Sequence, residues 1–274
     1  MMLTGLIFSF LFGIAVGSFL NVLVDRSVRE ASVFGRSYCE SCGTPLPWYD
    51  LVPVLSFFIL KGKCRYCDKK ISWRLPLVEF LAGSGFLFVY WYFFYYPGLL
   101  NTYSLPVALL LLSYYLVVFS LCVVLFFTDL EYGLLPNSLT FSLAGFVFFF
   151  QLIFYLFALP YPIDGTLLLR LLCGFCFAAF FALLFKLSGG KAMGGGDAKL
   201  AFSIGLVLGW PLTLVSALLS FLFGGLISVI LVLVGYKNLK DTIVFGPFLI
   251  SSFLAVLFFG NLFSSLFSRW LAFF

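Results

Sequence analysis

Residues 105–128 read LPVALLLLSYYLVVFSLCVVLFFT and contain no charged side chain. About 20 apolar residues in an α-helix are enough to cross the hydrocarbon core of a bilayer, so this stretch predicts a membrane-spanning helix. The first charge follows directly, as Asp129. Because a carboxylate at membrane level is costly to keep there, Asp129 is a candidate functional residue.

The pattern of this stretch repeats along the chain. Hydrophobic residues make up 63% of the 274 residues, charged residues only 10%, and the mean hydropathy is +1.16. This composition excludes a soluble domain and predicts an all-α polytopic membrane protein. The apolar runs are continuous rather than alternating, which disfavours a β-barrel. They predict about eight transmembrane helices, at 3–24, 77–97, 105–128, 139–160, 166–187, 198–210, 211–235 and 243–267.

Two of these runs need comment. The first has neither a positively charged start nor a small-residue cleavage site, so we expect a retained helix rather than a removable signal peptide. The run 198–210 is short and is separated from the next only by Trp210-Pro211. Whether this run crosses the membrane completely stays open at this point.

The basic residues predict the orientation. Of the 16 Lys and Arg residues, all but Arg170 and Arg269 fall on or near one side of the membrane if the N-terminus lies outside. Since basic residues gather on the cytoplasmic side, we expect a multi-pass protein with its N-terminus outside. That orientation puts Asp129 and Asp197 on the same, cytoplasmic face.

The segment 25–76 is the only long polar part of the chain, and it contains two C-x-x-C pairs. These are Cys39 with Cys42, and Cys64 with Cys67. Two such pairs about twenty residues apart are typical of a structural zinc site with four thiolate ligands. Cytosolic thiols stay reduced, which favours zinc over disulfides; reduced or redox-active dithiols are the alternative.

The same segment holds nine basic and five acidic residues, and four thiolates with one Zn²⁺ would reduce its net charge to about +2. That weak balance does not favour nucleic-acid binding, and the basic side chains are expected to face lipid headgroups. We therefore expect three parts: a first helix (1–24), a cytoplasmic zinc domain (25–76) and a membrane domain (77–274).

Asp197 closes the run Gly194-Gly195-Gly196-Asp197 and opens an apolar stretch. Hydrolysis of a peptide bond needs a base that activates water and an acid that protonates the carbonyl oxygen and the leaving amine. Two close carboxylates that share one proton can do both. The chain has no histidine, which excludes Ser-His and Cys-His triads and His-ligated zinc hydrolase sites. Asp129 and Asp197 are therefore the candidate catalytic pair.

Each member of the pair also has an ordinary explanation. Asp197 alone is equally consistent with a helix N-cap, and Asp129 with a solvated position beside Glu131. If the helix ends near Thr128, its dipole disfavours negative charge on Asp129, whereas the start of the next helix favours it on Asp197. On that premise we expect Asp129 to hold the shared proton and Asp197 to act as the base.

The residues around Asp197 suggest supporting roles. Gly194 and Gly196 lack Cβ atoms, so we expect them to allow positive φ angles and a close approach of the substrate backbone in a flexible loop, 187–196. Lys199 either orients the substrate or a carboxylate, or simply extends towards the headgroups.

Taken in order, these motifs resemble the bacterial type IV prepilin peptidases, which are membrane aspartic proteases of the GxGD type. The resemblance covers nearly the whole chain and rests on these segments: Gly17-Ser18-Phe19-Leu20-Asn21-Val22, the two C-x-x-C pairs, Pro53-Val54-Leu55-Ser56, Arg74-Leu75-Pro76-Leu77-Val78-Glu79, Asp129-Leu130-Glu131, Leu135-Pro136-Asn137, Gly194-Gly195-Gly196-Asp197-Ala198-Lys199-Leu200 and Phe245-Gly246-Pro247-Phe248. Glu40 stands where the family usually has proline, and Asn137 where it often has aspartate.

The resemblance implies a function. Members cleave the leader peptide from prepilins and pseudopilins at the cytoplasmic face of the bacterial inner membrane. They then methylate the new N-terminus with S-adenosylmethionine. Glu79 is a candidate for the methyl-transfer step, with an interfacial ion pair to Arg74 as the alternative.

Two other classes of function are carried alongside. A transporter would use Asp129 and Asp197 as a proton or cation site, but such carboxylates are expected near the bilayer midplane rather than at its inner boundary. A zinc-dependent membrane sensor or scaffold would use segment 25–76, but gives no reason for the glycine-rich run before Asp197.

Overall fold

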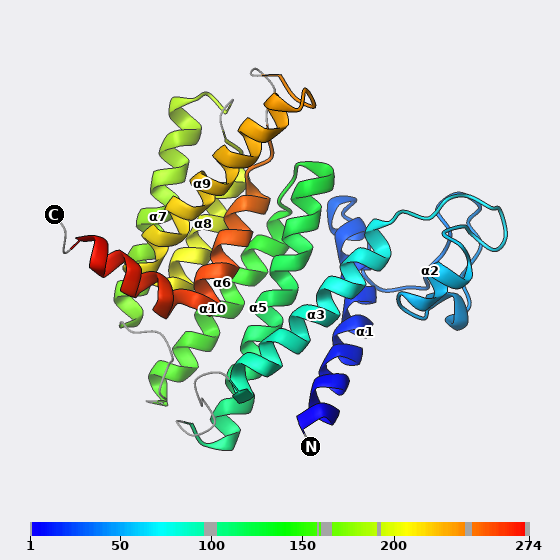
Figure 1. Ribbon diagram of the computed structural model, residues 1–274, viewed down its shortest axis with the longest axis horizontal. Helices are drawn as coiled ribbons and strands as arrows, with labels where there is room; N and C mark the ends of the chain where they lie inside the picture. Colours follow the sequence, from blue (N-terminus) through cyan, green and yellow to red (C-terminus); the bar gives the residue numbers. More distant parts are fainter. Residues whose placement is uncertain are drawn as a thin grey trace. The chain divides into compact units, whose positions relative to one another are not determined.

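A computed structural model of the chain describes residues 2–95, 103–157, 159, 166–190, 193–238 and 243–271 (Figure 1). In these ranges the only regular elements are helices, accompanied by two isolated β-bridges. The chain forms two compact units, Met1–Val124 and Leu125–Phe274. The helices are α1 (Met2–Val28), η1 (Trp48–Leu51), α2 (Leu55–Ile59), α3 (Arg74–Tyr95), α5 (Leu105–Tyr132), α6 (Asn137–Leu156), α7 (Leu167–Leu187), α8 (Gly195–Leu208), α9 (Leu212–Leu233) and α10 (Gly246–Leu271).

The helical membrane architecture agrees with the expectation. Of the helices in the described ranges, 6 are long and apolar enough to cross a membrane: α1, α3, α5, α6, α7 and α9. The other two of the predicted eight are α8, with 14 residues, and α10, whose backbone is non-helical at Phe259. That α10 also crosses stays a prediction, and whether α8 crosses completely stays open. Residues 96–97 of the predicted run 77–97, and residues 158 and 160 of the predicted run 139–160, lie outside the described residues.

In the first unit, α1 and α3 lie side by side (Figure 1). Glycines make this approach possible, because a Cβ on Gly17 would lie 2.7 Å from the Cα of Glu79. Small residues are the usual means by which membrane helices pack backbone to backbone. The first helix continues to Val28, beyond the predicted end at Val24. Between α1 and α3 the insert is mostly irregular, with only η1 and α2.

In the second unit, α8 lies among α6, α7, α9 and α10 (Figure 1). Every residue from Ser203 to Leu208 is buried, as expected for a short apolar helix that is surrounded by others. α7 and α8 meet backbone to backbone, since a Cβ on Gly205 would lie 2.7 Å from the Cα of Gly174. The unit is thus built around the helix whose first turn contains the candidate Asp197.

The C-terminal end of α8 is buried, and its carbonyl groups accept hydrogen bonds from side chains of neighbouring helices. The side-chain amide of Gln151, in α6, donates to the carbonyl of Leu206 at 2.7 Å. A guanidinium N–H of Arg170, in α7, donates to the carbonyl of Val207 at 3.3 Å. Both side chains are buried, and a cation suits the negative end of a helix dipole. Arg170, one of the two exceptions to the charge pattern, therefore caps a neighbouring helix.

The glycine contact between α7 and α8 predicts a stability difference. We expect Gly205→Ala to lower the free energy of unfolding by about 1–3 kcal/mol, because its methyl group would meet the backbone of α7. Gly145→Ala, in α6, is the control: no atom lies within 4 Å of its Cβ position. It should be neutral or stabilising by up to about 1 kcal/mol. Thermal unfolding in detergent measures both, and equal stability of the two variants would contradict the packing argument.

Candidate active site and metal cluster

Asp197 occupies the third residue of α8 and is 5% exposed. Its Oδ2 accepts a hydrogen bond of 3.0 Å from the backbone N–H of Gly194, the residue that precedes the helix. This is the capping interaction in which the third residue of a helix reaches back to the cap position. Asp197 is thus inside the helix rather than before it, and the capping contact leaves its other oxygen, Oδ1, available.

Asp129 lies in the last turn of α5 and is 4% exposed. The expectation that this helix ends near Thr128 was wrong: α5 continues to Tyr132, and the carbonyl of Asp129 accepts from the N–H of Gly133 at 2.8 Å. The dipole argument built on that premise therefore lapses. The Asp129 carboxylate is buried, and its Oδ2 has no hydrogen-bond partner among the described residues.

Both carboxylates belong to the second unit, and they interact electrostatically. Gly246, the first residue of α10, lies against Asp129. The backbone N–H of Gly246 faces the Asp129 carboxylate, and a Cβ on Gly246 would overlap Oδ2 of Asp129. Sequence reasoning did not assign a role to Gly246. The sequence shows only a glycine directly before the proline that opens an apolar run, and this does not indicate which residue the glycine faces.

The glycines before Asp197 act differently from the expectation. Gly194 has a φ of −79°, and none of the residues from Gly194 to Gly196 has a positive φ. Gly196 is instead required by packing, because a Cβ on it would lie 2.9 Å from the Cβ of Leu135. Positive φ angles occur earlier, at Gly189 and Gly190. Residues 191–192 of the predicted flexible loop lie outside the described residues.

The Lys199 side chain contacts other residues of the protein and does not simply extend towards the headgroups. Its ammonium donates a hydrogen bond of 2.6 Å to the side-chain oxygen of Asn137 and lies 5.8 Å from the ring centre of Phe141. The contact joins the first turn of α8 to the first turn of α6. Asn137, noted above as a departure from the family pattern, is thus the acceptor that Lys199 uses.

In the first unit, the two C-x-x-C pairs form two turns with the same hydrogen bonds. The N–H of Cys39 donates to the carbonyl of Thr44, and the N–H of Gly43 to the carbonyl of Cys39. The second turn repeats this pattern with Cys64: its N–H donates to Lys69, and its carbonyl accepts from Asp68. Gly43 and Asp68, at equivalent places, both have positive φ. The repeated turn presents each cysteine pair in the same way.

The four thiol sulfurs all lie within 4.8 Å of one another, and Cys39 Sγ lies 3.8 Å from Cys67 Sγ. A tetrahedral zinc with Zn–S bonds of about 2.3 Å sets its sulfurs about 3.8 Å apart, so the cluster fits such an ion. The hydrogen bond with the Thr44 hydroxyl lowers the pKa of Cys42 to about 6, whereas burial and the neighbouring thiols raise the pKa of Cys67 to about 12. Metal binding needs the thiolate form, and four adjacent thiolates need a cation between them.

Ion pairs connect this cluster to its surroundings. Arg65, between the second pair of cysteines, donates to both oxygens of the buried Asp50, with the shortest distance 2.7 Å. Glu40, between the first pair, lies 2.8 Å from Arg29, just after α1. Both groups of this second pair are half exposed, so it contributes little to stability. It does give Glu40, which stands where the family usually has proline, a partner in the structure.

Glu79, in α3, does not pair with Arg74, which forms a 2.7 Å ion pair with Asp25 instead. Glu79 is 8% exposed, and its carboxylate accepts the N–H of Val54 at 2.6 Å and lies beside Ser18. Val54 has φ 61° and ψ −51°, the values of a γ-turn closed by the Leu55 N–H on the Pro53 carbonyl. A β-branched residue with positive φ is strained, and such strain often marks a functional site.

Known proteins similar to this chain cover most of its length. Residues 11–93 match the bacterial peptidase A24 N-terminal domain, and residues 116–229 the type IV leader peptidase family. A prepilin leader peptidase/N-methyltransferase of Legionella pneumophila is 30% identical, with 92% of this chain and 90% of the relative aligned. One of Klebsiella pneumoniae is 34% identical, with 77% and 89% aligned.

A third relative of the same name, from Myxococcus xanthus, is 34% identical; the alignment spans 83% of this chain and 63% of that protein. No solved structure matches the chain. The matched segments contain both candidate aspartates, all four clustered cysteines and Glu79, and the resemblance read from the motifs is confirmed. The chain belongs to the type IV leader peptidase family.

Proposed function

We propose that this protein is a bifunctional prepilin peptidase. It removes the leader peptide of type IV prepilins and pseudopilins by hydrolysis at Asp129 and Asp197, and then methylates the new N-terminus. The main support for the peptidase step is a pair of buried carboxylates within one compact unit, with the charge of Asp197 acting on Asp129. The names of the relatives, prepilin leader peptidase/N-methyltransferase, support both steps.

The two carboxylates together supply what amide hydrolysis needs. One carboxylate, ionised, takes a proton from water, and the resulting hydroxide attacks the carbonyl carbon of the scissile bond. The other, protonated, gives its proton to the carbonyl oxygen. The proton gained by the base then goes to the leaving amine as the C–N bond breaks, and one hydroxyl of the tetrahedral intermediate returns its proton to the acid as the C=O bond re-forms, so the water atoms end on the two products.

The hydrogen bonds favour Asp197 as the base and Asp129 as the acid. Asp197 accepts the Gly194 N–H at the positive end of α8, which stabilises negative charge. Asp129 also has the Gly246 N–H against its carboxylate, but its Oδ2 is buried without a hydrogen-bond partner among the described residues, and this oxygen is proposed to carry the proton. A neutron structure with the resting proton on Asp197 would overturn this assignment.

The active site is proposed to lie at the cytoplasmic boundary of the inner membrane, with the N-terminus outside. The positive-inside distribution of Lys and Arg supports this orientation, and Arg170, one of its two exceptions, is accounted for by its contact with α8. The prepilin leader is basic, as is the inner face of this protein. Recognition is therefore proposed to rest on the apolar helix of the substrate, which enters among the membrane helices.

The four clustered cysteines are proposed to hold a structural zinc ion. The insert has only two short helices and little apolar core, so a bound metal would supply much of its folding free energy. The matching turns around Cys39 and Cys64 support the proposal, because they bring the thiols together from two separate segments.

Glu79 is proposed to take part in methyl transfer, for which S-adenosylmethionine would supply the methyl group. Ser18, beside the Glu79 carboxylate, lies one turn before Asn21 on α1, and Oδ1 of Asn21 is buried without a partner among the described residues. A carboxylate with a free amide oxygen suits a cationic group such as a sulfonium or an N-terminal ammonium.

Substitution of either aspartate tests the peptidase mechanism. Asp129→Asn and Asp197→Asn keep the shape of the side chain but cannot exchange the proton, so each should reduce prepilin cleavage by at least about 1,000-fold. The measurement is leader removal in proteoliposomes. Glu131→Gln, which neutralises an exposed carboxylate in the same helix turn, should cleave like the wild type. Undiminished cleavage by either asparagine variant would reject the pair.

Metal analysis tests the zinc proposal. The purified protein should contain about one zinc ion per chain, and Cys64→Ser should lose it because three thiolates close the site poorly. Cys176→Ser, an exposed cysteine in α7, should keep the metal. Limited proteolysis should then cut segment 25–76 faster in Cys64→Ser than in the control. Equal zinc content in the two variants would exclude the cluster as the metal site.

Glu79→Gln separates the two activities. Transfer of a labelled methyl group from S-adenosylmethionine to a cleaved pilin should fall by at least about tenfold, because the glutamine cannot make the charged hydrogen bond with the Val54 N–H. Leader removal should stay within about threefold of the wild type, because Glu79 is far from both aspartates in the sequence. Glu30→Gln, an exposed carboxylate in the same unit, is the control. Equal loss of both activities would mean that Glu79 supports the fold rather than the transfer.

A further inference from the structure

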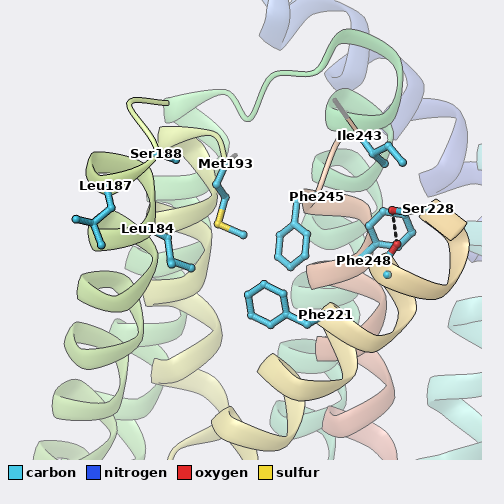
Figure 2. Close-up of a pocket in the computed structure, with 11 residues that line it drawn as sticks. Leu184, Leu187, Ser188, Met193, Phe221, Ser228, Ile243, Phe245 and Phe248 are labelled. Atoms are coloured by element: carbon cyan, nitrogen blue, oxygen red, sulfur yellow. Dashed lines mark hydrogen bonds between the residues drawn. The ribbon is translucent and has the colours of Figure 1, made fainter. Parts of the chain in front are cut away.

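The second unit contains a cavity of about 600 Å³ between the C-terminal halves of α7 and α9 and the start of α10 (Figure 2). Its lining residues carry no charge, and the polar side chains among them are two serines. Figure 2 shows that Leu184, Met193, Phe221 and Phe245 point towards one another across this space. Gly224 and Gly225, adjacent in α9, leave part of the wall without side chains.

Two residues that line the cavity are chain neighbours of the glycines that contact the candidate catalytic carboxylates. Met193 is the residue before Gly194, whose N–H binds Asp197. Phe245 is the residue before Gly246, which lies against Asp129. The walls therefore belong to the two segments that contact the two carboxylates. A peptide advances about 3.3–3.6 Å per residue, so a substrate residue next to a bond held at the aspartates would lie beside these same segments.

We propose that this cavity receives the first apolar side chain of the substrate helix, on the C-terminal side of the scissile bond. The inference rests on the proposed function, which supplies a substrate whose apolar helix remains after the leader is removed. An uncharged cavity of this size favours a large aliphatic or aromatic group over water. Met193 is an adaptable wall, since its thioether has three rotatable bonds and fits side chains of different shape. The cavity would thus set specificity beside the bond that is cut.

Gly225 gives access to the cavity without disturbing the fold. No atom lies within 4 Å of the position that its Cβ would occupy, so a larger side chain there would enter open space. Gly225→Leu should therefore fill part of the cavity. Gly145→Leu is the matched control, since Gly145 is also a helical glycine of the second unit with open space at its Cβ, and it does not line the cavity.

The experiment measures kcat/KM for two prepilins that carry Phe or Ala directly after the scissile bond, in proteoliposomes. The wild type should prefer the Phe substrate by about tenfold or more. Gly225→Leu should lose at least about tenfold on the Phe substrate and stay within about threefold on the Ala substrate. Gly225→Ala should show a smaller loss in the same direction. Gly145→Leu should behave like the wild type with both substrates.

The outcomes separate this inference from the proposed function. If the wild type cleaves neither substrate, the proposed function falls and the inference with it. If the wild type cleaves both but Gly225→Leu and Gly225→Ala leave the preference for Phe unchanged, the cavity is filled by lipid or lies unused, and only the inference is overturned. An equal loss on both substrates in the Gly225 variants, beyond that in Gly145→Leu, would also overturn it, because it would show a general effect on the fold.

Discussion

Backbone groups inside a membrane protein must be hydrogen-bonded within the protein, because lipid offers them no partner, and α8 shows how this constraint shapes the second unit. The helix has only 14 residues, and residues near both of its ends are buried. At its start the Asp197 side chain accepts the Gly194 N–H, and at its end Gln151 and Arg170 donate to its last carbonyls. Helices α6 and α7 thus hold the element that carries Asp197 in place.

The same interaction makes a capping role of Asp197 compatible with its proposed catalytic role. A capping aspartate and a catalytic aspartate were weighed above as competing explanations, yet the cap uses Oδ2 and leaves Oδ1 for other partners. The cap fixes the orientation of the carboxylate, which is what a general base requires. Gly196 adds to this order, because its lack of a side chain lets Leu135 pack directly on the first turn of α8. The glycine run thus allows close packing around the first turn of α8.

Much of this fold was predictable from the sequence, because each long apolar run implies a helix and each polar segment a boundary. The clustering of Cys39, Cys42, Cys64 and Cys67 was predictable from spacing alone, since the repeated C-x-x-C turn has a known shape. Family membership also favours the peptidase expectation over the transporter and the sensor.

Contacts between distant segments were not predictable. The pairing of Lys199 with Asn137, the approach of Gly246 to Asp129 and the caps on the end of α8 join residues that lie far apart in the chain. No local pattern encodes these contacts. The end of α5 was missed for another reason: Asp129 is polar, but helix formation does not stop at a polar residue when the following residues can continue the turn.

The γ-turn at Val54 has a consequence for how this protein can diverge. A β-branched residue in that conformation costs about 1–3 kcal/mol, and the Glu79 carboxylate offsets part of that cost by accepting the Val54 N–H. The two positions lie in different segments, yet the substitutions that one position tolerates depend on the residue at the other. Lineages that replace Glu79 should therefore carry glycine or asparagine at position 54, and paired changes at these two sites should be commoner than single ones.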